Sequence, residues 1–188
     1  MPESTWDCNL SCFNLPVAPF VIIEKCQTWN EVDKISRYIE DYPFVKTCEF
    51  SPKDWKDPPV FSDASSAVEA LKNSNRCHLN RHIVMKKERQ YSEQSRVYWC
   101  EDKPRLVCGN MEHCRVTDFL DRYHYDIPFH YCCIELGCGD NQVEVIEINT
   151  FSTRCDPSPL DWKQDWEKIL FSPKIIWCDI LKKFNYKG

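Results

Sequence analysis

The sequence predicts a mixed α+β fold in which antiparallel hairpins are combined with a few amphipathic helices. Short apolar runs typical of strands alternate along the chain with segments whose apolar residues recur at helical spacing. Two pairs of these runs are separated only by turn residues, which predicts hairpins. The 188 residues, 43% of them apolar and 13% aromatic, suffice to bury the core of one domain or of two small lobes. We therefore expect a folded α+β protein with antiparallel sheets.

The first part of the chain, residues 1–43, is predicted to form an N-terminal arm, a strand and a helix. Pro16 and Pro19 favour an irregular arm over residues 1–19, and Phe20–Ile23 is a short apolar run suited to a buried strand. Thr28 and Glu31 have the spacing of a capping box, which predicts a helix that ends before the proline at position 43.

The rest of the chain, residues 44–188, is predicted to be a single compact unit. Strands are expected at Phe44–Phe50, His82–Met85, Arg96–Cys100, Arg105–Cys108, Tyr131–Leu136 and Val143–Ile148. Helices are expected at about Ser62–Leu71, Val116–Tyr123, Leu160–Leu170 and Ile175–Lys183. Ser62 or Asp63 would cap the first of these helices, and Thr117 the second. The last four strands form two hairpins, around residues 101–104 and 137–141.

The balance of basic and acidic side chains limits the kinds of partner that the protein could bind by charge. The sequence has 24 basic and 29 acidic side chains, a net charge of −5. This mild acidity argues against a protein held on nucleic acid or an anionic membrane by bulk charge. No stretch reaches the roughly 18–20 apolar residues of a membrane span, and the sequence does not open with the pattern of a secretory signal. We therefore expect a cytoplasmic protein.

Two residue counts limit the kinds of site. The 13 cysteines show no CxxC spacing, and neither His78 nor His82 has the adjacent glutamate of a metalloprotease motif, so zinc is disfavoured. Buried thiols in a reducing compartment are expected instead, with a nucleophilic cysteine–histidine pair left open. The four glycines include no GxGxxG or GxxxxGK[ST] motif. A nucleotide would therefore be held by side-chain cations and metal rather than by a glycine loop.

The most informative segment is Ile134–Asn149, IELGCGDNQVEVIEIN. A hairpin here would bring Glu135 near Glu147, and Asn149 would project from the same face because it is two residues further on. Three oxygen-bearing side chains on one rigid face suit a hard cation such as Mg²⁺. Glu144 would project from the opposite face of its strand and is expected to be exposed to solvent. The alternative is an ordinary solvent-exposed strand face that binds no metal.

Three cations complement this acidic face. Lys46 and Lys86 each follow apolar residues within a predicted strand, and Arg96 begins another. Lysines at such positions are often surface residues whose stems cover apolar groups. In a chain that also offers a metal face, the same three cations could neutralise a triphosphate.

Six segments between about Phe44 and Trp166 carry a further signal through their order. They are FVKTCEFSPKDW (44–55), HIVMKKERQYSEQSRVYW (82–99), RLVCGN (105–110), VTDFLDRY (116–123), IELG (134–137) and VEVIEINTFSTRCDPSPLDW (143–162). In this order they resemble the cell division cycle protein 123 family of atypical ATP-grasp proteins.

The last segment is the most specific of the six. It is similar to a strand of that family that ends in Asp-x-Asn-Pro-Phe, followed by a Thr-Asp and by a tryptophan that opens a helix. The corresponding positions here are Glu147, Asn149, Phe151, Asp156 and Trp162.

The resemblance implies an ATP-grasp fold with two small α+β lobes around a nucleotide cleft, and Mg²⁺ that bridges the phosphates of ATP. It implies metal ligands at Glu135, Glu147 and Asn149, phosphate contacts from Lys46 and Lys86, and Arg96 facing the same cleft. The family is an ATP-dependent assembly chaperone for the translation initiation factor that delivers initiator tRNA, and it binds the gamma subunit of that factor. Mg-ATP and a protein partner are therefore expected.

The chain resembles a reduced and divergent copy of the family. Glu135 and Glu147 stand where the family has aspartates, Lys86 replaces an arginine, and Thr150 replaces a proline. Two alternatives to an ATP-binding assembly factor are open. One is a non-catalytic interaction protein that retains the fold with a degraded nucleotide site. The other is an ATP-dependent carboxylate–amine ligase, as in the wider superfamily; a nucleic-acid substrate is disfavoured.

Overall fold

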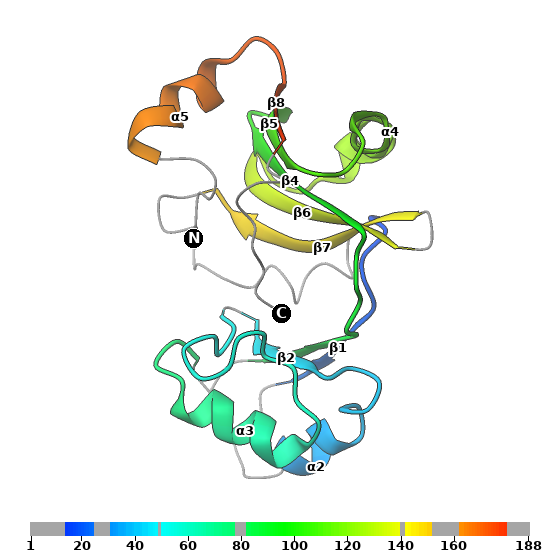
Figure 1. Ribbon diagram of the computed structural model, residues 1–188, viewed down its shortest axis with the longest axis vertical. Coiled ribbons are helices and arrows are strands. Elements are labelled where there is room, and N and C mark those ends of the chain that lie inside the picture. Colours follow the sequence, from blue (N-terminus) through cyan, green and yellow to red (C-terminus); the bar gives the residue numbers. More distant parts are fainter. Residues whose placement is uncertain are drawn as a thin grey trace. The chain divides into compact units, whose positions relative to one another are not determined.

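The computed structural model describes residues 14–24, 31–48, 50–77, 82–139, 142–151 and 162–179. They form two compact units, each with its own sheet and helices (Figure 1). The first unit contains the described residues from Ala18 to Arg89, and the second contains residues 14–17 together with those from Gln90 onward. The mixed α+β fold class is confirmed. The sequence-based division after residue 43 falls inside the first unit, so residues 44–188 extend over both units.

The first unit is a three-stranded antiparallel sheet with two helices on one face. Its elements are β1 (Phe20–Ile23), α2 (Glu31–Ser36), β2 (Phe44–Thr47), α3 (Ala64–Asn73) and β3 (Ile83–Lys86). The strand order is β1-β3-β2, with β3 antiparallel to both neighbours. The buried side chains of Ile35, Val45, Leu71 and Met85 belong to one apolar core that joins both helices to the sheet.

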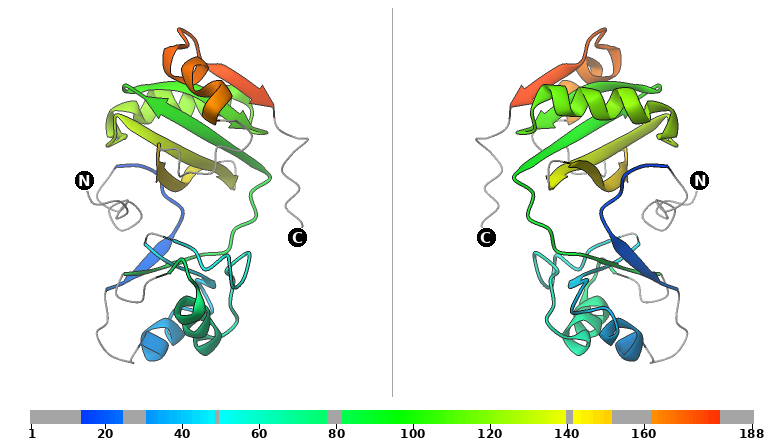
Figure 2. Two further views of the ribbon diagram at one scale, coloured as in Figure 1. Left: turned by 90° about the vertical axis from the view of Figure 1, so that its left-hand side faces the viewer. Right: turned by 90° about the vertical axis from the view of Figure 1, so that its right-hand side faces the viewer.

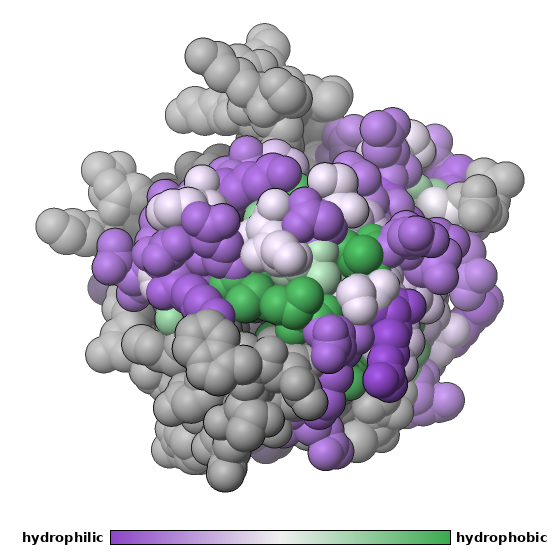
Figure 3. All heavy atoms as spheres, turned by 90° about the horizontal axis from the view of Figure 1, so that it is seen from below, coloured by the Kyte–Doolittle hydropathy of each residue, from purple (hydrophilic) through white to green (hydrophobic). Residues whose placement is uncertain are grey.

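The outer surface of α2 and α3 is largely polar, as expected for amphipathic helices. Figure 3 views the molecule from the side of these helices and shows mainly hydrophilic residues around a hydrophobic strip. The apolar faces of both helices are directed toward the sheet, because Ile35 and Leu71 are fully buried in the core.

Helix α3 is fixed at both ends by aspartates. Asp63, one of the two predicted caps, is the N-cap, and its carboxylate accepts a hydrogen bond of 2.8 Å from the backbone N–H of Ser66. At the other end, the hydroxyl of Ser74 and the N–H of Asn75 donate bonds of 2.6 and 2.8 Å to Asp54. These bonds, led by that from Ser74, lower the pKa of Asp54.

Strand β2 is shorter than the predicted Phe44–Phe50. It ends at Thr47, where the backbone N–H and the hydroxyl of Thr47 each donate a 2.9 Å bond to the carbonyl of Phe50. The N–H of Phe50 donates a 3.0 Å bond back to the Thr47 hydroxyl. These reciprocal bonds close a turn. The backbone groups that take part in it are therefore bonded within the turn and do not continue the ladder.

The second unit contains a five-stranded sheet with a helix on each face (Figure 2). Its elements are β4 (Glu93–Cys100), β5 (Lys103–Gly109), α4 (His113–Tyr123), the 3₁₀ turn η2 (His124–Asp126), β6 (Tyr131–Gly139), β7 (Gln142–Thr150), α5 (Trp162–Phe171) and β8 (Ile176–Asp179). The strand order is β7-β6-β4-β5-β8, and only the β5–β8 pair is parallel among the paired strands described. Ile169 of α5 packs on the face that carries Tyr98, Cys108 and Cys133, and α4 lies on the opposite face.

Both predicted hairpins of this unit are present. β4 and β5 are joined at Glu101 and Asp102, whose φ angles of 53° and 59° lie in the left-handed region. Two successive residues in this region match the right-handed twist of the flanking strands. β6 and β7 form the second hairpin, with its turn at residues outside the described ranges.

One predicted helix and one predicted helix cap are wrong, and a second predicted cap lies outside the described residues. Residues 176–179 form a strand instead of the predicted helix, and residues 180–183 are outside the described residues. Helix α4 begins at His113, so Thr117 lies within it and is not its cap. The proposed cap Thr28 is outside the described residues, and the helix after it covers only Glu31–Ser36.

Strand β8 forms because it pairs with β5, and because side chains of β5 and α4 contact β8 and the residues just before it. The guanidinium of Arg105, on β5, donates a 2.8 Å bond to the carbonyl of Ser172, just before β8. The ring of Trp177 stacks on His113 of α4, with centroids 3.9 Å apart. These tertiary contacts outweigh the helical spacing that the sequence suggested. No helix in the described part of the chain is both long and apolar enough to cross a bilayer.

Candidate functional site

The candidate metal residues lie side by side on the second unit's sheet. Glu135 of β6 is directly opposite Glu147 of β7, and on its other side it is opposite Arg96 of β4. Directly opposed side chains on adjacent strands have Cβ atoms about 4.5–5.5 Å apart. The structure thus places Glu147, Glu135 and Arg96 in one row across three strands, which we call the acidic row.

Arg96 and Glu135 form an ion pair within this row. The Nη2 atom of Arg96 lies 2.5 Å from Oε1 of Glu135, and both side chains are about a quarter exposed. Burial alone would lower the pKa of Arg96, but the charge of Glu135 and the neighbouring Cys133 and Tyr98 outweigh burial and raise it. The guanidinium is therefore a permanent positive charge that holds one oxygen of Glu135.

Asn149 extends the oxygen set along β7. It is two residues from Glu147, it is opposite Cys133, and its side chain is half-buried. No register shift separates it from Glu147, so the two side chains project from the same face. The sequence-based expectation that Glu135, Glu147 and Asn149 share one face of the hairpin therefore holds as a matter of backbone geometry.

The set of donors on this face has the chemistry that magnesium requires. Two carboxylates and an amide supply hard oxygens, and water or phosphate oxygens would complete an octahedron. Elsewhere in the described residues no group of three or more His, Cys, Asp or Glu side chains is arranged to hold a metal. The acidic row contains only two such residues and depends on Asn149 for its third protein donor.

Glu144 does not occupy the position that the sequence predicted. It was expected on the opposite parity and in solvent, but it is buried, with 8% of its surface exposed. The reason is a register shift in the β6–β7 ladder, where Glu135 pairs with Glu147 but Leu136 pairs with Val145. The extra residue moves Glu144 onto the parity of the acidic row, opposite Gly137.

A tyrosine that the sequence analysis did not single out contacts this carboxylate. The hydroxyl of Tyr91 donates a 2.6 Å hydrogen bond to Glu144. Its ring lies so close to Gly137 that a Cβ atom there would come within 2.5 Å of it. The run Val143-Glu-Val-Ile-Glu-Ile contained a signal for this arrangement: two consecutive apolar residues, Val145 and Ile146, break the alternation and indicate a bulge.

The candidate phosphate-binding lysines belong to the first unit. Lys46 on β2 is opposite Val84, and Lys86 on β3 is opposite Phe44, so both lysines are on the same face of the sheet. That face is the one opposite Val45 and Met85, which pack in the helical core. Lys46 is 3% exposed and Lys86 is 9% exposed. Lysines are rarely buried to this degree, which marks both positions as special.

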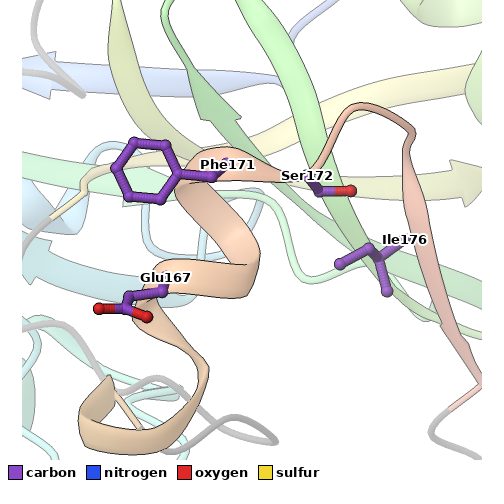
Figure 4. A pocket seen from close by; sticks show the side chains of 4 residues that line it. All are labelled: Glu167, Phe171, Ser172 and Ile176. Carbon is purple, nitrogen blue, oxygen red and sulfur yellow. The ribbon is translucent and has the colours of Figure 1, made fainter.

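A separate hollow of about 450 Å³ lies beside α5 (Figure 4). Its described lining residues are Glu167 and Phe171 of α5, Ser172, and Ile176 of β8. None of the six site residues predicted from the sequence lines it within the described ranges.

The comparisons with known proteins identify the fold. No family model matches the chain, and no curated protein matches it in sequence. Among solved structures, it is similar to Cdc123 from Schizosaccharomyces pombe, with a TM-score of 0.74, 14% identity, and coverage of 95% of this chain and 96% of that one. A C-terminally truncated form of the same protein gives a TM-score of 0.73 at 12% identity, with 94% of each chain covered.

A second fold relative has ATP-grasp in its name. It is a RimK domain protein ATP-grasp from Sphaerobacter thermophilus, with a TM-score of 0.56 and 12% identity over 78% of this chain and 58% of that one. The low identities show a strongly divergent sequence on a shared backbone. The chain has the ATP-grasp-like fold of Cdc123, as the resemblance in its sequence had indicated.

Proposed function

We propose that this protein binds Mg-ATP and uses it in the assembly of another protein. The observation that carries the proposal is the acidic row of Glu147, Glu135 and Arg96, with Asn149 two residues along β7, on a sheet of an ATP-grasp-like fold. An isolated strand face of ordinary surface residues has no reason to hold two half-buried carboxylates opposite each other, since like charges in that position are destabilising.

Magnesium would relieve the repulsion between these carboxylates. Glu147 and Asn149 would bind the metal, together with the oxygen of Glu135 that is not held by Arg96. The longer side chain of glutamate, compared with the aspartates of the family, lets Glu135 reach Arg96 and still offer a second oxygen. When bound, the metal would screen the charges of the ATP phosphates.

The buried lysines would supply the remaining positive charge. Lys46 and Lys86 present ammonium groups on one sheet face, and burial in a low-dielectric site strengthens their attraction for phosphate. Holding phosphate by side chains and metal agrees with a chain that has only four glycines and no phosphate-binding glycine loop.

The assembly role rests on the similarity to Cdc123. By analogy with the family that the sequence resembles, the partner would be the gamma subunit of the translation initiation factor that delivers initiator tRNA, and the protein would act in the cytoplasm. The net charge of −5 agrees with a protein partner better than with nucleic acid.

Titration calorimetry with ATP, in the presence and absence of Mg²⁺, tests the binding proposal. We expect magnesium-dependent binding that falls at least tenfold in Glu147→Ala and in Asn149→Ala. Glu69→Ala is the matched control, because Glu69 is an exposed carboxylate on α3. A wild-type protein that stays folded and binds no nucleotide at millimolar Mg-ATP contradicts the proposal.

One observation favours a second candidate, a non-catalytic interaction protein that keeps the fold. Arg96 already neutralises Glu135 across 2.5 Å, so the acidic row has an internal counter-ion and does not depend on a metal for all of its charge balance. This candidate predicts a purified protein with a stoichiometric protein partner and no bound nucleotide. Mass spectrometry of the native complex separates the two candidates.

A further inference from the structure

Two cysteines lie side by side at one edge of the second unit's sheet. Cys108 of β5 is directly opposite Cys178 of β8 in the parallel ladder, and Cys178 packs against the buried cluster that contains Cys108. Neighbouring strands are about 4.8 Å apart, and disulfides join cysteines whose Cα atoms are about 4.4–6.8 Å apart. A bond between these sulfurs therefore requires little movement of the backbone.

The two thiols differ in accessibility. Cys108 is 2% exposed, and burial, with the neighbouring Cys178 adding to it, raises its pKa to about 12. Cys178 is only partly buried, on a four-residue strand whose described ladder is the one with β5. Cys178 can thus react with a small molecule from solvent, while Cys108 is buried beside it.

We propose that Cys108 and Cys178 are a redox modification site, where a low-molecular-weight disulfide such as oxidised glutathione converts the two thiols into an intramolecular disulfide. The thiolate of Cys178 attacks one sulfur of that disulfide, its S–S bond breaks, and one thiolate leaves. The thiolate of Cys108 then attacks Sγ of Cys178 and displaces the second. The two cysteines lose two electrons and two protons, and the oxidant is reduced to two thiols.

The position of this pair gives the modification a structural consequence. Cys108 is also directly opposite Arg96, so the register row continues from Glu147 and Glu135 through Arg96 to Cys108 and Cys178. A disulfide would join β8 covalently to the strand next to Arg96. The site itself does not depend on nucleotide binding, so its test is independent of the proposed function.

Peptide mapping of the whole protein after incubation with oxidised glutathione at pH 8 tests the proposal. Cleavage after Arg105, Glu112 and Lys174 places Cys108 in the peptide 106–112 and separates it from the exposed Cys114. We expect a disulfide-linked species of this peptide with the one that contains Cys178. It should disappear on reduction, and in Cys108→Ser and Cys178→Ser.

Two controls decide between the outcomes. Cys114→Ser removes an exposed thiol and should leave the cross-link unchanged. Glutathione attached to Cys114, with no link between Cys108 and Cys178, would show that the oxidant was active and would overturn the proposal. So would a link that forms only in urea, since it would not report the folded pairing. A link in the folded protein, lost in either single variant, supports it.

Discussion

The hydroxyl of Tyr91 donates a partly buried hydrogen bond to the buried carboxylate of Glu144, next to a strand irregularity. Burial of a carboxylate costs free energy unless donors compensate it, and hydrogen bonds to charged groups are stronger than neutral ones. Around this pair the N–H of Val145 donates to the carbonyl of Pro16 at 2.7 Å, which binds the β7 edge to the segment before β1. The Tyr91 side chain therefore stabilises the bulge that orients the acidic row.

We predict that Tyr91→Phe destabilises the protein by about 1–3 kcal/mol, because it removes one donor from a buried carboxylate and leaves the ring in place. Urea unfolding followed by tryptophan fluorescence measures the change. Tyr125→Phe is the matched control, since Tyr125 is 90% exposed and should change stability very little. Equal effects of the two substitutions would show that the Glu144 bond does not contribute.

At the scale of elements, the alternation of apolar residues predicted the strands well but not their register. The phase break between Val145 and Ile146 was present in the sequence, yet it takes the ladder with β6 to show that Glu144 joins the face of Glu147. Asp63 could be recognised as a cap because its partner is three residues away. Strand β8 could not be predicted from the sequence, because its pairing with β5 and the stacking of Trp177 on His113 join distant parts of the chain.

The aspartates at the ends of α3 give this element a pH dependence. Hydrogen bonds lower the folded-state pKa of Asp54, chiefly that from Ser74, and of Asp63, chiefly that from the Ser66 amide. A pKa below the unfolded value means that the unfolded state binds more protons. The stabilisation is therefore fully present above about pH 4 and is lost as the pH falls further.

We accordingly predict that Asp54→Ala lowers the melting temperature at pH 7, and that its difference from the wild type shrinks as the pH falls below about 4. Thermal unfolding followed by circular dichroism between pH 3 and 7 measures both. Asp121→Ala is the control, because Asp121 is an exposed aspartate on α4. A difference that stays constant over this pH range would contradict an ionised Asp54 as the anchor of α3.

For the whole molecule, the order of motifs predicted more than any single residue did. Identity to Cdc123 is only 14%, yet the fold matches over 95% of the chain. A backbone is set by the pattern of buried strands and helices, which tolerates many substitutions if apolar positions are kept. A binding site depends on individual side chains, so the roles of the glutamates and lysines must be tested directly.

The roles of Lys46 and Lys86 can be tested through the effect of Mg-ATP on the stability of the folded protein. A ligand that binds only the folded state stabilises it by about 2.7 kcal/mol at a hundred times its dissociation constant. We predict that Mg-ATP raises the melting temperature of the wild type, and that Lys46→Met and Lys86→Met abolish most of this increase while keeping the apolar stem of the side chain. Lys53→Met, at an exposed lysine of the first unit, should retain it. If either buried lysine can be replaced with the full Mg-ATP-dependent shift retained, its ammonium does not bind phosphate, and its burial has a purely structural cause.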